Sequence, residues 1–416
     1  MRSFHYSMLL ARPVRFLILA LGVSVLLSQN ALSASATPPP TVTPKPGDVV
    51  FIPPPPPIEE ETKDVSEDDI NALVSALQSG LPLTAANTQI LASLSQTLLQ
   101  DINARLFRLR AGANSRPDGA QGPTGKEVKA PVEETYHKWQ IYTAGDYGYF
   151  DLDASGRQAG FESDTWVATL GAEYRINRIF AVGISGSYVN SGADFSNKIG
   201  SVDTEGFAFS AYGSAVVGNF YADLLYSLGT YDQDLRRNTF TGRTARGDTD
   251  VLTNALQFNT GYNFNCGNFR TGPIAGLSWL HGDIDGYRET GGGNAGLNIG
   301  GQDFDSLVSQ LGWQAAYVAQ TGFGTIIPQL RASWDHEYLN GSQNVSASLQ
   351  QSPFANGNSF TATGRTSAPG RDWLNLGAGV SAQIGERFTV TADFTTHLFQ
   401  ERTTAYTGSL KLGVSF

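Results

Sequence analysis

The stretch Tyr406-Thr407-Gly408-Ser409-Leu410-Lys411-Leu412-Gly413-Val414-Ser415-Phe416 alternates strictly between two kinds of residue. Even-numbered positions carry aromatic, aliphatic or glycine residues, and odd-numbered positions carry Thr, Ser, Lys or Gly. A period of two is typical of a β-strand with one apolar and one polar face. The stretch therefore predicts a long strand that runs through Phe416.

The same alternation continues upstream as far as Lys138. In one segment, Leu330 and Trp334 lie on the apolar face, and Arg331 and Asp335 lie on the polar face. The predicted strands are ten to fourteen residues long, which exceeds the usual soluble strand and suits a tilted membrane strand. Charges on the polar face are costly in a dry core but not in a wet lumen. We therefore expect apolar side chains outward and polar side chains inward.

Twelve such strands alternate with short and long connections. The strands are predicted to begin near residues 138, 164, 179, 203, 220, 250, 269, 305, 325, 373, 387 and 405. Short connections fall at 177–178, 218–219, 265–268, 321–324 and 385–386, and long polar loops at 151–163, 191–202, 232–249, 283–304, 340–372 and 400–404. Short periplasmic turns and long external loops are typical of outer-membrane barrels. We predict an all-β fold, a twelve-stranded antiparallel transmembrane β-barrel over 138–416.

Composition agrees with this class and excludes others. Only 16% of residues are charged and 46 are glycine, and the mean hydropathy of -0.19 is too polar for a bundle of membrane helices. A net charge of -10 argues against nucleic acid as a partner, which needs a basic surface. A single cysteine excludes an intrachain disulfide framework and a cysteine-rich zinc site. We expect no cofactor and no metal.

The N-terminal part has the features of an exported protein. Three arginines precede the twelve-residue apolar run Phe16–Leu27, and Ala34-Ser35-Ala36 is an acceptable cleavage site. Residues 1–36 are therefore predicted to be a signal peptide. Residues 37–65, with five prolines at 53–57, are predicted to be an extended linker.

Helical periodicity appears between 66 and 110. A first helix begins near Ser66 and is predicted to stop at Gly80 and Pro82. A second amphipathic helix is predicted over 84–110, with an apolar stripe that includes Ile90, Leu94, Leu98, Ile102 and Leu106. Residues 111–137 are predicted to be a flexible linker.

An amphipathic helix, twelve strands after it and a terminal aromatic resemble the translocator domain of the autotransporters, the type V secretion family. The resemblance implies that helix 84–110 threads the pore, that the segment before it lies outside, and that the protein resides in the outer membrane of a Gram-negative bacterium. A twelve-stranded barrel is wide enough for one helix. Family members usually export a large passenger, whereas here about Thr37 to Leu83 would be exported.

The resemblance also implies partners and functional residues. The last strand is similar to the signal that the barrel-assembly machinery recognises, with Tyr406, Leu410, Leu412, Val414 and Phe416 as its residues. The expected partners are outer-membrane lipid, this machinery and periplasmic chaperones, and we expect a monomer. With the helix in the pore, Arg105 and Arg108 could pair with lumen carboxylates. The candidate contacts between helix and lumen are Arg105, Arg108, Glu173, Arg331, Asp335, Glu337, Asp393 and Lys411.

An enzymatic function is not expected. Gly183-Ile184-Ser185-Gly186-Ser187 approaches the serine-hydrolase motif but fails at its last position and lies within a strand. His281, His336 and His397 are interpreted as residues of the interfacial girdle. We expect an autotransporter-type barrel that translocates or anchors its N-terminal segment at the cell surface. The alternatives are a structural or adhesive protein that acts through its external loops, and a small-solute pore.

Overall fold

A computed structural model describes residues 67–113, 138–155, 158–239, 241–339, 344–350, 361–366, 370–385 and 387–416. Within the helix, side chains are described at 80–100, 102–103 and 105–107. The predicted signal peptide, the linker 37–65 and residues 114–137 of the second linker lie outside the described residues. In the part of the chain that is described, no helix is both long enough and apolar enough to cross a membrane.

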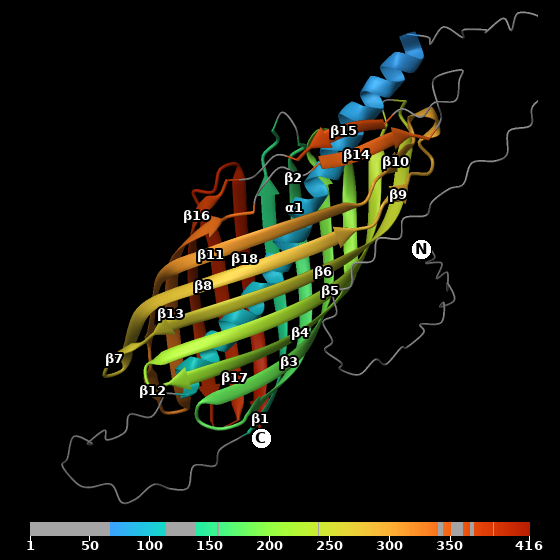
Figure 1. The fold of residues 1–416 in the computed structure, drawn as a ribbon. Helices are drawn as coiled ribbons and strands as arrows, with labels where there is room; N and C mark the ends of the chain where they lie inside the picture. Colours follow the sequence, from blue (N-terminus) through green and yellow to red (C-terminus); the bar gives the residue numbers. More distant parts are fainter. Residues whose placement is uncertain are drawn as a thin grey trace, which may run out of the picture. The chain divides into compact units, whose positions relative to one another are not determined.

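Twelve long antiparallel strands form a closed barrel, as predicted (Figure 1). They are β1 (Trp139–Leu152), β2 (Phe161–Arg175), β3 (Phe180–Phe195), β4 (Gly200–Val217), β5 (Phe220–Asn238), β6 (Thr244–Tyr262), β8 (Phe269–Ile284), β11 (Gln302–Tyr317), β13 (Gly324–Glu337), β16 (Asp372–Ile384), β17 (Phe388–Leu398) and β18 (Thr403–Ser415). Each pairs with the next, and β1 pairs with β18 from Gln140 opposite Ser415 to Leu152 opposite Thr403. Short strands β7 (Phe264–Cys266) and β12 (Ala319–Thr321) extend two periplasmic turns.

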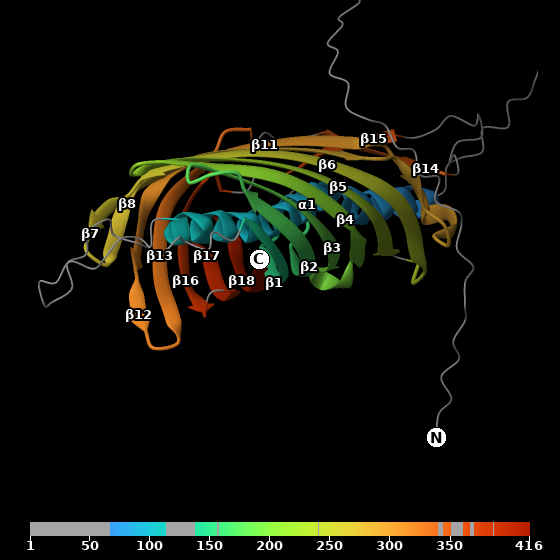
Figure 2. The same ribbon diagram turned by 90° about the horizontal axis from the view of Figure 1, so that it is seen from below.

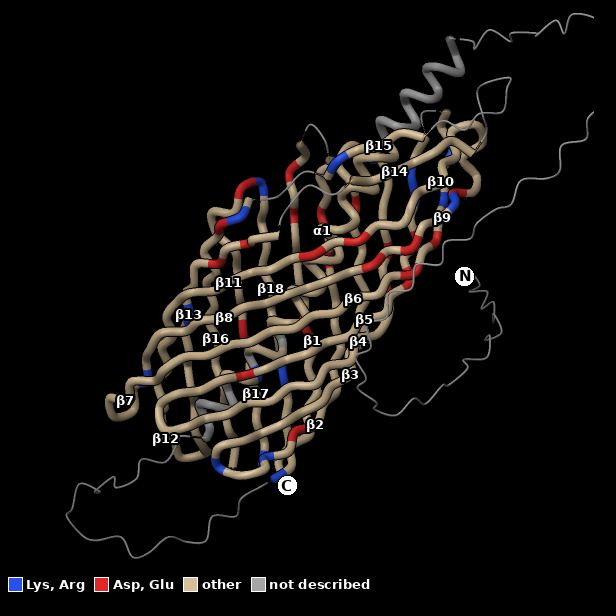
Figure 3. The backbone as a smooth tube through the Cα atoms, viewed as in Figure 1, with Lys and Arg blue, Asp and Glu red and all other residues tan. Residues whose placement is uncertain are grey.

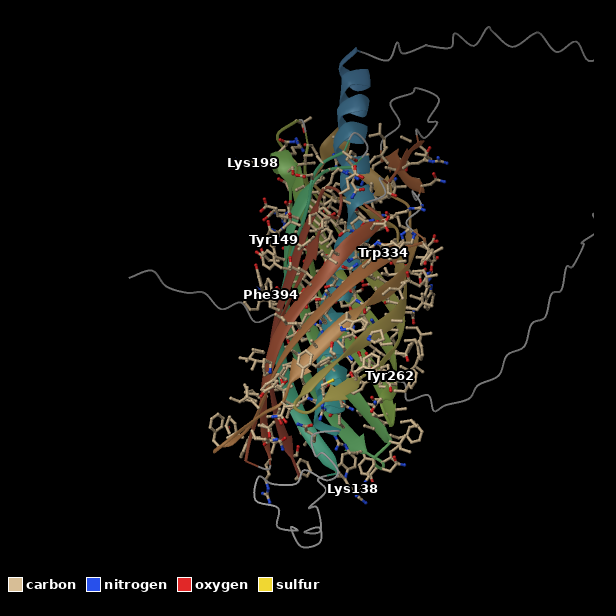
Figure 4. All side chains as sticks on the ribbon, turned by 90° about the vertical axis from the view of Figure 1, so that its left-hand side faces the viewer. Lys138, Tyr149, Lys198, Tyr262, Trp334 and Phe394 are labelled. Carbon is tan, nitrogen blue, oxygen red and sulfur yellow. The ribbon has the colours of Figure 1, made fainter. Side chains whose placement is uncertain are left out.

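The side chains are distributed as the alternation predicts. On β2, Leu170 is 64% exposed, whereas its neighbours Thr169 and Gly171 point into the barrel and are buried. Figure 4 shows Tyr149, Trp334 and Phe394 on the outside of the wall, with Lys138 and Lys198 toward opposite ends. Figure 3 shows that charged residues gather toward the ends of the strands. The apolar outer band is the surface that contacts lipid.

Two of the predicted loops are mostly strand. Where a loop was expected at 232–249, β5 continues to Asn238 and β6 starts at Thr244, so each strand is 19 residues long. The loop expected at 191–202 shrinks to a short connection that holds η1 (Ser196–Lys198). The reason is that alternation persists in these charge-rich segments, with Val202 and Leu235 buried inside and most charges outside. Arg237 is the exception, since it is inward and buried. Strands β4 to β6 therefore form a tall wall at the external end.

The two longest external loops fold into a second, four-stranded sheet. Its order is β15 (Thr361–Arg365), β14 (Asn344–Leu349), β10 (Leu297–Ile299) and β9 (Tyr287–Arg288). The short helix η2 (Gly293–Ala295) joins β9 to β10. These five elements are called the collar below.

The helical segment is a single helix, α1 (Glu67–Ala113), so the expected break at Gly80 and Pro82 is wrong. Proline lacks an N–H and usually interrupts a helix. Here Thr84 Oγ1 donates to the Gly80 carbonyl at 2.9 Å, and the Pro82 carbonyl accepts from Ala159 N at 3.4 Å. One bond within the helix and one from the surrounding chain therefore support the turn that contains Pro82. The helix also ends at Ala113 rather than at 110.

Leu330, in the middle of β13 and 63% exposed, tests whether the apolar side chains of the strands face lipid. Leu330→Arg should lower the free energy of unfolding by about 2–4 kcal/mol, because a cation would face the hydrocarbon. Urea unfolding in lipid vesicles measures this change. Asn268→Arg in a periplasmic turn is the control and should cost under about 1 kcal/mol. Equal effects of the two substitutions would contradict a lipid-facing Leu330.

Candidate functional site: the helix in the lumen

The helix α1 runs through the lumen (Figures 1 and 2). It contacts β1 to β5, β8, β11 and β18, which lie on opposite sides of the ring. Its apolar stripe joins one buried cluster with inward residues of the wall, and its members include Leu91, Leu94, Leu98, Ile102, Leu106, Val189, Leu225, Val251 and Leu280. The inward wall is therefore apolar on the side that receives this stripe.

The other side of the helix is polar and faces a polar wall. Ser93, Gln96, Thr97 and Gln100 line a cavity of about 20 Å³ together with residues of β1, β2, β17 and β18. That volume holds about one water molecule. The lumen is thus divided into an apolar half and a polar half, and the amphipathic helix matches both.

Arg105 lies at the centre of the site, where its side chain is fully buried. Arg105 Nε donates to Glu173 Oε1 on β2. The guanidinium carbon lies 3.5 Å from the centre of the Tyr142 ring, which is a cation–π contact. The Tyr212 hydroxyl lies 3.0 Å from both Glu173 Oε1 and the Tyr142 hydroxyl. A buried cation is thus paired with a buried anion through Glu173 Oε1, whereas Arg105 Nη2 and Glu173 Oε2 are buried without a hydrogen-bond partner among the described residues.

Two glycines make room for the tyrosines. Tyr142 on β1 is opposite Gly171 on β2, and Tyr212 on β4 is opposite Gly183 on β3. A Cβ at Gly171 would lie 2.3 Å from the Tyr142 ring, and one at Gly183 would lie 2.4 Å from the Tyr212 ring. The rings therefore lie flat across the neighbouring strand, which leaves the centre of the lumen open for Arg105.

Two amide pairs add further helix–wall bonds. Asn87 and Gln233 exchange bonds of 2.7 and 3.0 Å, and Gln233 also donates to Thr204. Asn103 accepts from Asn259 at 2.8 Å. Neither these residues nor Tyr142 and Tyr212 were predicted from the sequence as helix contacts. Their side chains look like ordinary strand polar residues until the register and the rotation of the helix are known.

The structure brings Arg105 to one of the four predicted carboxylates, Glu173. Asp393 is instead bonded to Arg331 on the wall at 2.6 Å. The other two also have wall partners: Asp335 accepts from Ser333, Gln310 and Asn375, and Glu337 accepts from Ser306, Leu307 N and Leu339 N. Lys411 is inward and buried. The side chain of Arg108 lies outside the described residues.

The residues of the predicted assembly signal lie on the outer face of β18. Leu410, Leu412, Val414 and Phe416 are between 40% and 54% exposed. Tyr406 is packed between Tyr149 and Phe394, at ring distances of 4.9 and 6.3 Å. The Phe416 and Trp139 backbones exchange two hydrogen bonds, so this strand also closes the barrel.

The interpretation of the three histidines as girdle residues is wrong for one of them. His281 and His336 are on the outer face and bond to Asp305 and Asp372 at 3.0 and 2.8 Å. His397 is inward and buried, and it lines the small polar cavity beside the helix. The alternation itself predicts this outcome, because His397 shares the polar face of its strand with Asp393 and Thr395, and that face points into the lumen.

These features define a class of protein, an outer-membrane β-barrel whose lumen holds the helix that precedes its first strand. Residues 141–395 match the family model described as the autotransporter beta-domain. The chain belongs to this family, and it is an outer-membrane translocator barrel.

Solved and curated relatives agree with this assignment. The translocator domain of the autotransporter NalP from Neisseria meningitidis aligns with a TM-score of 0.57 and 14% identity, over 77% of this chain and 97% of that one, which shows the fold. Esterase EstA of Pseudomonas aeruginosa is 25% identical over 58% of this chain and 37% of its own length. Outer membrane protein B of Rickettsia prowazekii is 24% identical over 84% of this chain and 21% of its own length. The chain thus spans well under half of these two relatives.

Glu173→Gln tests the buried ion pair. It should lower the free energy of unfolding by about 3–5 kcal/mol, because it leaves Arg105 charged and unpaired in the lumen. The double variant Arg105→Met/Glu173→Met should recover most of this loss, since no buried charge remains. Urea unfolding in vesicles measures both. The control is Glu205→Gln, an exposed carboxylate bonded to Tyr188, which should cost under about 1 kcal/mol. A loss no larger than the control would contradict the role of Glu173.

Proposed function

We propose that the barrel exports its own N-terminal segment and then keeps it at the cell surface, with α1 retained in the lumen. The observation that carries this is the buried Arg105–Glu173 pair inside the ring. A chain that runs along the lumen has one end at each side of the membrane. Leu83, Ala86 and Ile90 of the helix lie at the collar, the helix continues beyond it to Glu67, and its other end packs through Phe107 on Ala316 and Ile327, near the periplasmic turns. The segment before the helix is thereby directed outward.

We propose a boundary of the exported segment that differs from the expected one. Thr37 to Leu83 was expected to be exported, but Leu83 is buried among wall and collar residues. Leu81 packs on the same cluster. We therefore place the last exported residue before Gly80.

Assembly of this barrel would use the general route for outer-membrane proteins. The outward aliphatic row of β18 is available to the barrel-assembly machinery before the strand pairs with β1, and periplasmic chaperones would deliver the unfolded chain. The row is exposed in the finished barrel, as a lipid-facing strand must be. We propose that the folded protein is a monomer, because the ring closes on itself without a second copy.

We further propose that the barrel carries out no catalysis. EstA and Lipase 1 of Photorhabdus luminescens have enzyme names, and this chain covers 37% and 29% of their lengths. The shares matched leave most of each enzyme-named relative outside the comparison, so their names do not carry over to this barrel. A solute pore is the less favoured alternative, because the helix occupies the lumen.

Surface labelling tests export. The native Cys266 lies exposed at the end of β7, next to a periplasmic turn, so a membrane-impermeant maleimide should not label the wild-type protein on intact cells. The variant Pro55→Cys/Cys266→Ser should be labelled on intact cells, because residue 55 would be outside. Labelling of the same protein after cell lysis confirms that each thiol is reactive. An unlabelled Pro55→Cys on intact cells would contradict export.

Bilayer conductance tests the plug. The full chain should hold a planar bilayer nearly closed, because the apolar stripe of the helix packs on the inward wall and its polar side lines a cavity of about 20 Å³. Deletion of residues 85–110 should give large, stable channels, since a twelve-stranded ring is wider than one filled by its own side chains. Equal conductance with and without the helix would favour the solute-pore alternative.

A further inference from the structure

The collar packs on residues 80–90 of α1, where the helix leaves the barrel. The helix contacts η2, β10, β14 and β15. The residues of the shared buried cluster include Leu83, Ala86 and Ile90 from the helix and Leu297, Ile299, Ala347 and Leu349 from the collar. Leu297 and Ala86 are both fully buried. The apolar side of the collar is therefore covered by the helix and by the tall wall.

Glycines at three points allow this close approach. A Cβ at Gly80 would lie 2.3 Å from Leu297 Cδ1, so Leu297 occupies the space beside the helix backbone. A Cβ at Gly200 on the wall would lie 2.9 Å from Leu83, and one at Gly364 on β15 would lie 3.4 Å from Leu81. Glycine and proline are the poorest helix formers. Gly80 and Pro82 together leave this turn of the helix dependent on its contacts.

A buried ion pair fixes the collar to the wall at the same level. Arg237 on β5 donates to both carboxylate oxygens of Glu289, at 2.8 and 2.6 Å, and to the Ala295 carbonyl at 2.7 Å. Glu289 also accepts from Leu297 N at 2.8 Å. The carboxylate thus holds both the arginine and the strand that carries Leu297. Burial raises the pKa of the neighbouring Tyr287 phenol, and the Glu289 charge raises it further.

The collar depends on the helix for its own burial. Without the helix, Leu297 would lose the groove at Gly80 and would face water in the mouth of the barrel. Apolar side chains that are exposed in this way favour rearrangement of the loops that carry them. The collar strands are short and come from two loops far apart in the chain, so apart from the Arg237–Glu289 pair and the backbone bonds the helix supplies most of their apolar cover.

We propose that the collar is a clasp that closes on residues 80–86 once the helix has entered the external mouth, and that it retains the exported segment there. This inference rests on the proposed function, the export of the N-terminal segment. The clasp would act by shape, through Leu297 at Gly80, whereas the deeper lumen site acts by charge. A helix that slid toward the periplasm would have to pull Leu81 and Leu83 out of the cluster and leave Leu297 uncovered.

Exchange of the small and the large residue at positions 80 and 297 tests the clasp. Gly80→Leu puts a side chain into the volume that Leu297 fills, and Leu297→Ala removes the same contact without crowding. Trypsin is added to intact cells, and cleavage after Arg288 and Arg365 of the collar is followed by mass spectrometry. Cleavage after Arg402, in the β17–β18 turn, is the reference. Each single variant should speed collar cleavage about tenfold, because proteolysis follows the population of the opened state. The double variant Gly80→Leu/Leu297→Ala should return it toward the wild-type rate.

The outcomes separate this inference from the proposed function. Unchanged collar cleavage in both single variants overturns the clasp, and so does faster cleavage that the double variant does not correct. Labelling of Pro55→Cys/Cys266→Ser on intact cells reports export independently. If that label is absent while the swap behaves as expected, export fails and the contact between collar and helix stands. If the label is present while the swap has no effect, export stands and the clasp is overturned.

Discussion

The closure of the sheet is the constraint on which the rest of the structure depends. In hydrocarbon no water is available for unpaired N–H and C=O groups, so a sheet in lipid must have no free edge. Strand β18 meets this condition by pairing along β1, with the Phe416 backbone bonded to Trp139 at the periplasmic end. Once the ring is closed, its outer face is lipid and its inner face is a lumen. The alternation of side chains then follows from the pleat alone.

A closed ring of this size creates a second problem, because its lumen is too wide to be filled by short side chains. The wall solves this in two ways. Rings such as Tyr142 and Tyr212 fold sideways over glycines, which thins the lining, and the helix fills the remaining space. The amphipathic pattern of the helix, which in a soluble protein would mean one face on a core and one in water, here matches an apolar and a polar half of the same lumen.

The period-two pattern was sufficient for the fold because every strand carries it independently of its neighbours. Strand β1 begins at Trp139 instead of 138, and the largest difference among the barrel strands is β6, which begins at Thr244 instead of 250. The loop at 232–249 was predicted wrongly because charge was taken as a sign of a loop, whereas charges on an outward face beyond the lipid are compatible with a strand.

The partner of Arg105 could not be chosen from the sequence. The choice of Glu173 among four carboxylates needed the register of the wall strands and the rotation of the helix, and neither is determined by the local sequence. Pro82 was predicted to end the helix because local helix propensity is low there. The hydrogen bond from Ala159 and the packing of the collar, which support this turn, cannot be read from the local sequence.

Two contacts of the helix, Gly80 with Leu297 and Arg105 with Glu173, together determine its position in the lumen. Neither contact could do so alone. Gly80 and Arg105 are 25 residues apart, which is ~7 helical turns and ~38 Å, so they lie on nearly the same face. A buried ion pair contributes little net stability compared with apolar packing of the same volume, but it penalises every arrangement that leaves one charge alone. Leu297 similarly leaves room for a glycine alone, so a shift of the helix that brings any other residue beside Leu297 causes a steric clash. A shift of one residue along the lumen would rotate the helix by ~100° and break both contacts. The amphipathic stripe selects which side of the helix faces the apolar wall, and these two residues select the depth.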